Sequence, residues 1–136
     1  MNTRDDNTSH DEDELSVAMM QSDRGAEAWR AVVRAQAVAT PDHIDFYAVA
    51  GDMVATLRAL EELAQILSRQ VASYGDGRVL FDDGLDRDTD SLATPQERLS
   101  LAARQISVAG KSIGMATWPA NRFWSLIGHI GAEVSR

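Results

Sequence analysis

The sequence contains no cysteine, and this absence removes three kinds of site. Without thiols, the chain can form no disulfide, no cysteine-ligated metal centre and no cysteine nucleophile. Histidine is also scarce, because His10, His43 and His129 are the only three, and their spacing matches neither a metal-ligand pair nor a serine–histidine–acid set. The sequence therefore predicts a protein that is not an enzyme.

Long apolar runs are missing as well. Arg104 and Lys111 interrupt the one stretch that approaches the length of a membrane span, so neither a span nor a membrane partner is expected. The first residues, MNTRDDNTSHDEDE, are acidic and polar, which is the reverse of a secretory signal. We therefore expect a cytoplasmic protein, and its 136 residues correspond to one domain.

The net charge of −8 is unevenly distributed. Residues 1–14 hold six acids against one arginine, and residues 76–90 hold six acids against two, whereas residues 91–136 hold two acids against five bases. Free nucleic acid is not an expected partner, because affinity for it comes mainly from neutralising phosphates. One hypothesis is that the acidic segments act as a decoy in the nucleic-acid-binding site of another protein.

Two stretches keep an apolar rhythm of alternating three- and four-residue steps, which places the side chains on one stripe of an α-helix. The spacing predicts an all-α fold in which two long helices form an antiparallel hairpin. The first stripe is Phe46, Ala50, Met53, Leu57, Leu60, Ala64, Leu67, Val71 and Tyr74, and the second is Leu99, Ala102, Ile106, Ala109, Ile113, Ala116, Ala120, Phe123, Ile127, Ile130 and Val134.

Capping signals set the expected boundaries. Residues 1–11 are predicted to be a disordered acidic tail, and residues 12–136 a single domain resembling a three-helix bundle. Ser9 with Glu12 predicts a helix over about 12–39, Thr40-Pro41 one over 41–74, and Thr94-Pro95 one over 95–131, continued through Pro119 with a kink. The acidic loop 75–94 separates the last two helices, and its apolar triplet at 79–81 is expected to fold back on the hairpin.

The hairpin bend also predicts which residues face each other. If Tyr74 lies opposite Pro95, then Ala64 lies near Ile106 and Leu57 near Ile113. Large residues then face small ones for most pairs, as interdigitated packing requires. We therefore expect Leu57, Leu60 and Ile113 to be buried at the centre of the seam between the helices.

Small residues form a second stripe on the last helix, beside the apolar one. Glycine costs about 1 kcal/mol in a helix interior, so two glycines four residues apart indicate that another helix approaches closely. That helix is either the chain's own first helix, with Trp29 and Val33 in the groove, or a partner. The stripe is Ala103, Ser107, Gly110, Gly114, Thr117 and Asn121.

Three aromatic residues cluster around Pro119 and are either core or a binding hot spot. Together with the small residues they give a predicted interface, in which the partner is another protein or a second copy. The predicted interface residues are Ser107, Gly110, Gly114, Thr117, Trp118, Phe123 and Trp124.

The loop contains a pattern similar to a calcium-binding loop. Asp86, Asp88 and Asp90 stand at positions 1, 3 and 5, and Glu97 stands at position 12, so four carboxylates could converge on a cation. Ser91 replaces the usual glycine, Pro95 falls inside the loop, and Glu97 also fits a capping role. The other interpretation is a solvated acidic loop, and apart from this calcium no cofactor is expected.

In overall plan, residues 41–131 resemble the small helical-hairpin proteins of actinobacterial secretion loci and mobile elements. Tyr74-Gly75-Asp76-Gly77 occupies the bend at which the secreted hairpin family carries a Trp-x-Gly turn. The resemblance therefore implies architecture and no functional residue.

The sequence favours a non-enzymatic helical module for protein–protein interaction that self-associates as a homodimer or higher oligomer. A thin helical assembly of this length buries little area by itself, which favours association. The alternative hypothesis is a calcium-responsive module built on residues 82–97.

Overall fold

The computed structural model describes residues 16–82 and 93–134 of the chain. It contains three α-helices, α1 (Val17–Val38), α2 (His43–Ser73) and α3 (Pro95–Ile127), and none of the described residues is in a β-strand. The chain divides into two compact units, residues 1–41 with α1 and residues 42–136 with α2 and α3. The predicted all-α class is confirmed. The single domain predicted for 12–136 stays a prediction, and each unit is described by itself.

α1 begins at Val17, because the Ser16 hydroxyl accepts a hydrogen bond from the Met19 backbone N–H at 3.1 Å. The sequence predicted a start near residue 12 from Ser9 and Glu12, which lie outside the described residues. The helix ends at Val38, one residue before the prediction, and none of its residues is buried.

α2 begins two residues later than predicted, because Asp42 and not Thr40 caps it. The Asp42 carboxylate accepts from the His43 backbone N–H at 2.6 Å, and the Asp45 carboxylate accepts from the Asp42 backbone N–H at 2.9 Å. This reciprocal capping box fixes the first turn. The helix ends at Ser73, and Gly77 then adopts a φ of +70°, a left-handed conformation that suits glycine.

The described part of the loop corrects one expectation. Val79 and Phe81 are exposed, and only Leu80 of the apolar triplet is partly buried. The triplet as a whole therefore does not fold back on the hairpin.

α3 begins as the sequence predicted. The Thr94 hydroxyl accepts from the Glu97 backbone N–H at 3.2 Å, and Pro95 occupies the first turn, where no backbone donor is needed. Pro119 lies inside the helix without ending it. The helix ends at Ile127, four residues before the predicted end.

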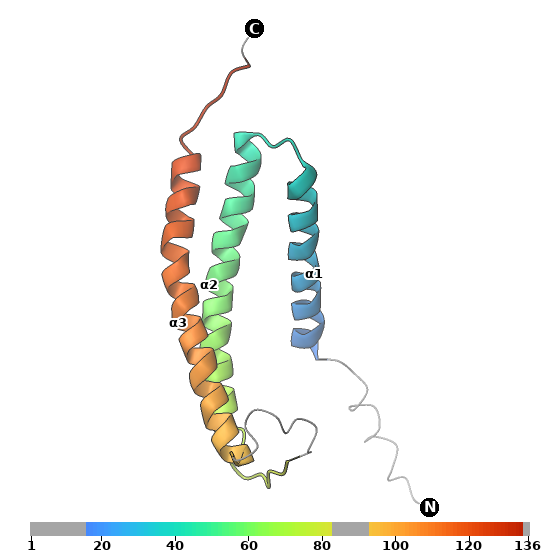
Figure 1. Ribbon diagram of the computed structural model, residues 1–136, viewed down its shortest axis with the longest axis vertical. Helices are drawn as coiled ribbons and strands as arrows, with labels where there is room; N and C mark the ends of the chain where they lie inside the picture. The colour runs from blue at the N-terminus through green and yellow to red at the C-terminus, as the bar shows by residue number, and fades with distance from the viewer. Residues whose placement is uncertain (1–15, 83–92, 135–136) are drawn as a thin grey trace, which may run out of the picture. The chain divides into compact units, whose positions relative to one another are not determined.

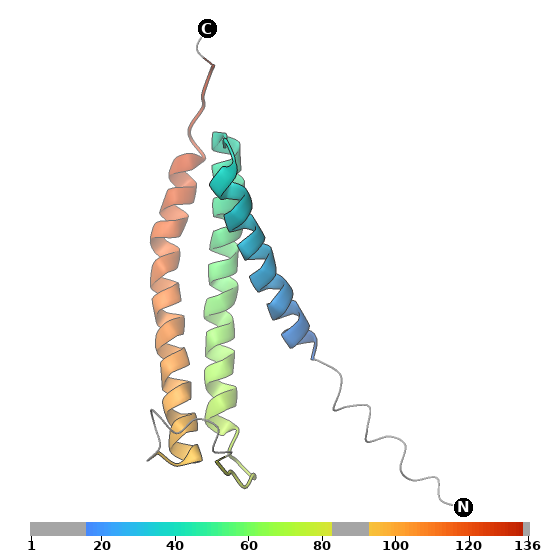
Figure 2. The same ribbon diagram turned by 45° about the vertical axis from the view of Figure 1, so that its right-hand side comes forward.

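α2 and α3 lie side by side and run in opposite directions (Figures 1 and 2), which confirms the predicted hairpin. The seam between them consists mainly of small side chains, because the fully buried residues are Ala50, Val54, Ala64, Ala103 and Gly110. The Ser68 hydroxyl also donates to the Ala103 carbonyl across the seam at 2.9 Å. Small side chains let the backbones of the two helices approach closely along the seam.

Four of the nine residues of the predicted α2 stripe lie in this seam. Ala50 and Ala64 are buried, and Leu57 and Val71 are partly buried. The other five residues, at seven-residue spacing, are exposed: Phe46, Met53, Leu60, Leu67 and Tyr74. The seam is completed instead by Val54, Glu61 and Ser68, so the helix is rotated relative to the prediction.

The expected burial of Leu60 is therefore wrong, because its side chain is 43% exposed. Leu57 and Ile113, its predicted companions, are partly buried. The predicted register is wrong by about one helical turn as well. Ala64 packs against Gly110 and not Ile106, since a Cβ atom at position 110 would lie only 2.9 Å from the Ala64 Cβ.

An aromatic pair closes the end of the hairpin at which α2 begins. The Tyr47 and Trp124 rings pack with their centroids 5.6 Å apart and tilted by 37°. Gly51 makes room for the indole, because a Cβ atom there would lie 3.2 Å from three indole atoms. Trp124 is thus part of the hairpin core.

Candidate interaction surfaces

The small-residue stripe of α3 belongs to the hairpin itself. Gly110 packs on Ala64, and a Cβ atom at Gly114 would lie 2.6 Å from the Glu61 Oε1 atom, so both glycines face α2. This corrects the expectation that the first helix or a partner fills the groove. Ser107 and Thr117 of the predicted interface are partly buried on the same side of α3.

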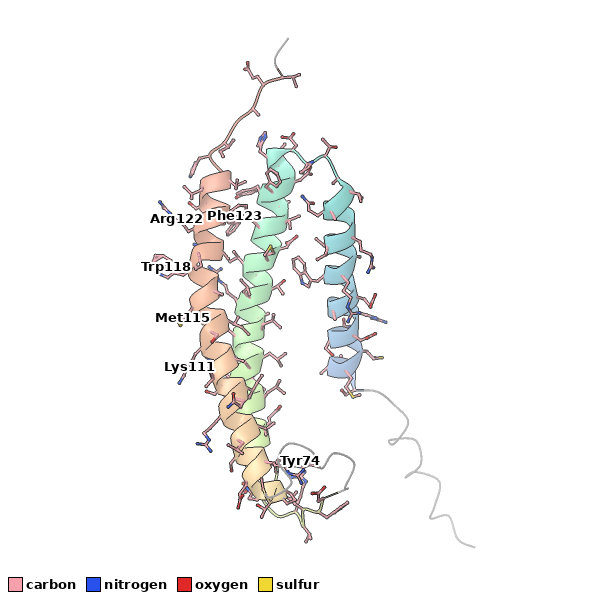
Figure 3. All side chains as sticks on the ribbon, viewed as in Figure 1. Tyr74, Lys111, Met115, Trp118, Arg122 and Phe123 are labelled. Carbon is pink, nitrogen blue, oxygen red and sulfur yellow. The ribbon has the colours of Figure 1, made fainter. Side chains whose placement is uncertain are left out.

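The three aromatic residues near Pro119 have different environments and form no common hot spot. Trp124 lies against α2, as described above, whereas Trp118 is 74% exposed and Phe123 is 50% exposed. Trp118 points away from α2 (Figure 3). Trp118 and Phe123 therefore remain available for contacts outside the hairpin, and they belong to different surfaces.

The first surface is an apolar face on one side of the hairpin. Its centre is the exposed column of α2, whose five large side chains recur every seven residues and are each between 37% and 51% exposed. Leu63 lies beside this column and is also exposed. The apolar face consists of Phe46, Met53, Leu60, Leu63 and Leu67 of α2, Tyr74 at the C-cap of α2, and Ile106, Ile113 and Phe123 of α3.

The residues of the apolar face lie on one side of the seam between α2 and α3, because the contact between Glu61 and Gly114 occupies the other side. Glu61 stands four residues after Leu57, and Gly114 stands four residues after Gly110, so their contact marks one side of the seam. Leu60 stands three residues after Leu57, and Ile113 stands three residues after Gly110. On each helix this side chain is therefore rotated from the seam in the direction opposite to Glu61 and Gly114. Leu60 and Ile113 therefore lie together on the other side of the seam, and the apolar face is continuous across both helices.

The second surface is a basic face on the outer side of α3. Its side chains follow alternating steps of three and four, and in Figure 3 Lys111, Met115, Trp118 and Arg122 line the edge of α3 away from α2. Met115 is 76% exposed. The basic face consists of Leu101, Arg104, Val108, Lys111, Met115, Trp118 and Arg122, all of them exposed.

The cations of the basic face are unpaired within the described structure. Arg104, Lys111 and Arg122 form no ion pair with a described residue, whereas Arg98, one turn before the face, binds Asp82 at 3.2 Å. No acidic residue occurs in the sequence between Glu97 and Glu133. The field along this side of α3 is therefore positive on a chain of net charge −8.

The predicted calcium site lies mostly outside the described residues. This applies to Asp86, Asp88 and Asp90, while Glu97 stands exposed in the first turn of α3. Within residues 16–82 and 93–134, no group of three or more histidine, aspartate and glutamate side chains is placed to hold a metal ion. The calcium hypothesis stays a prediction, and so does the decoy hypothesis.

Sequence reasoning missed the basic face, although the signal was present. The same steps of three and four that predicted the seam also place its seven residues on one stripe. Lysine and arginine interrupt this stripe, so it was not recognised as a possible contact surface.

Within the described part of the chain, no helix has the length and apolar character that crossing a membrane requires. Comparisons of the chain with protein-family models, with curated proteins and with solved structures find no match. The surfaces described above are therefore the basis for a functional proposal.

Proposed function

We propose that this chain is a non-enzymatic helical module for protein–protein interaction, and that it self-associates through the apolar face. The observation that carries the proposal is the exposed column of large apolar side chains on α2. Side chains repeated every seven residues along a helix provide a continuous surface for another helix. Scattered exposed apolar residues would need no explanation, but a continuous column does.

The composition of the seam gives a reason for self-association. The hairpin buries mainly alanine, valine and glycine, while its leucine, methionine and phenylalanine side chains stay partly in water. Full burial of one such large side chain stabilises a protein by about 1.5–3 kcal/mol. Covering the apolar face therefore supplies hydrophobic free energy that the small-residue seam lacks.

The column is also self-complementary, which favours a second copy as the partner. Leu60 stands at its centre. Met53 and Leu67 lie seven residues to either side of Leu60, and Phe46 and Tyr74 lie fourteen residues to either side. A two-fold axis at Leu60 would place Met53 against Leu67 of the second copy. Such pairing of one surface with itself is what two-fold dimers require.

The proposal can be tested with the double variant Leu60→Gln/Leu67→Gln. Both positions are exposed on the surface of α2, so the hairpin should form, and circular dichroism at 222 nm checks that it does. At about 0.5 M salt, where contacts between exposed charges are strongly screened, we expect the molar mass from light scattering to fall to the 14.8 kDa of one chain.

Arg58→Gln is the matched control, because Arg58 is exposed on α2 but lies off the apolar face. It should associate as the unmodified chain does. An unmodified chain that is already monomeric, or a double variant that associates equally well, would show that the apolar face is not the self-association surface.

A further inference from the structure

The outer side of α2 carries an acidic face that has no partner in the hairpin. Its residues follow alternating steps of three and four, and all are exposed. Asp52 and Glu62 form no ion pair with a described residue, while Asp45 also takes part in the capping box. The acidic face consists of Asp45, Ala48, Asp52, Ala55, Ala59 and Glu62.

The charges of the acidic face match those of the basic face in spacing. The acids at 45, 52 and 62 are separated by seven and ten residues, and the bases at 104, 111 and 122 by seven and eleven. With two such helices parallel, each carboxylate comes level with one cation to within one residue, about 1.5 Å along the helix axis. Charge complementarity of this kind determines which surfaces meet and in which register.

The sizes of the side chains match in the same register. Between the charged positions the acidic face carries alanine, at 48, 55 and 59, and the basic face carries Val108, Met115 and Trp118 at the corresponding levels. Large side chains on one helix can then enter the gaps above small ones on the other. The charged and the apolar positions thus specify the same alignment.

The two faces cannot meet within one chain. Both point away from the seam, on different helices of the same hairpin (the outer edge of α3 is labelled in Figure 3). We propose that the acidic face of one copy binds the basic face of a second copy, with α2 of the first parallel to α3 of the second.

This proposal deepens the self-association proposed above but uses different residues. Because each copy contributes a different surface, the contact is head to tail, and every added copy leaves one acidic and one basic face free. The resulting assembly grows with concentration. Salt weakens it, since exposed charges more than a Debye length apart are screened and even close pairs lose part of their attraction.

Charge reversal separates this contact from the apolar one. The variants are made in the Leu60→Gln/Leu67→Gln background, which lacks the apolar contact. There, Asp52→Lys and Lys111→Glu each place like charges opposite each other at the same level, so each reversal alone should weaken association at least about tenfold at low salt. The double variant Asp52→Lys/Lys111→Glu restores opposite charges between copies and should regain association. In an equimolar mixture of the two single variants, both contacts between unlike copies pair opposite charges: Asp52 with Lys111, and the substituted lysine with the substituted glutamate. The mixture should therefore also regain association.

Gln65→Lys and Gln105→Glu serve as controls, because they change the charge in the same directions, by one unit instead of two, at exposed positions outside both faces. Sedimentation velocity at low and at high salt measures the association of all the variants. If neither the double variant nor the mixture regains association, the proposal is overturned. The same result is expected if the basic face binds an anionic surface instead of a second copy. The Leu60→Gln/Leu67→Gln variant should keep this salt-sensitive contact, so failure of one proposal is distinguishable from failure of the other.

Discussion

At the scale of single residues, the hairpin depends on where small side chains allow two backbones to approach. Val54 is 1% exposed and is the largest of the fully buried side chains. Gly110 lies against the Ala64 Cβ, and Ala103 receives the hydrogen bond from Ser68. At these positions both added and removed volume should affect folding, because a close-packed interior tolerates neither voids nor overlaps.

Val54 provides a direct test of the seam. Val54→Ala should lower the free energy of unfolding by about 2 kcal/mol, since it removes buried methyl groups and leaves a cavity. Val33→Ala makes the same chemical change at a position that is 67% exposed and should change stability by less than about 0.5 kcal/mol. Urea denaturation followed by circular dichroism compares the two, and equal losses would mean that Val54 is not in the core.

Gly110 tests the register. Gly110→Leu should destabilise the hairpin by about 1–3 kcal/mol, because the new side chain overlaps Ala64. Ser112→Leu places the same side chain two residues further along α3 at an exposed position and should be tolerated. If Gly110→Leu is as stable as Ser112→Leu, then Gly110 does not face α2.

At the scale of elements, the start of α3 was predictable and the seam was not. Thr94 and Pro95 act locally, through hydrogen bonds and φ preference within one turn, so their pattern is legible in the sequence. Whether Met53 or Val54 faces α3 depends on a second helix far along the chain. The α2 stripe contained two neighbouring apolar columns, and the period alone could not show that one column is in the seam and the other on the surface.

Pro119 should weaken α3, because it removes one backbone hydrogen bond in the middle of the helix. Pro119→Ala should therefore raise the free energy of unfolding, by up to about 3 kcal/mol. Pro95→Ala is the control, since the first turn of a helix needs no donor there and the change should be small. Thermal unfolding of both variants measures the difference, and a stability unchanged by Pro119→Ala would contradict a continuous helix through this position.

At the scale of the molecule, the hairpin has a small-residue seam, one apolar face, and outer faces of opposite charge. The sequence predicted the hairpin itself, because two long periodic stretches around an Asp- and Gly-rich loop allow few other folds. It also predicted self-association, but through Gly110 and Gly114, which lie against α2. The small residues were correctly interpreted as a site of close helix approach, and only the identity of the approaching helix differed.

Self-association through the apolar face is the central claim, and the molar mass of the unmodified chain tests it most directly. Sedimentation equilibrium should be measured at about 0.5 M salt, where contacts between exposed charges are strongly screened. We expect the mass to rise with concentration from 14.8 kDa towards twice that value. A mass of 14.8 kDa at every concentration up to about 100 μM would contradict the account.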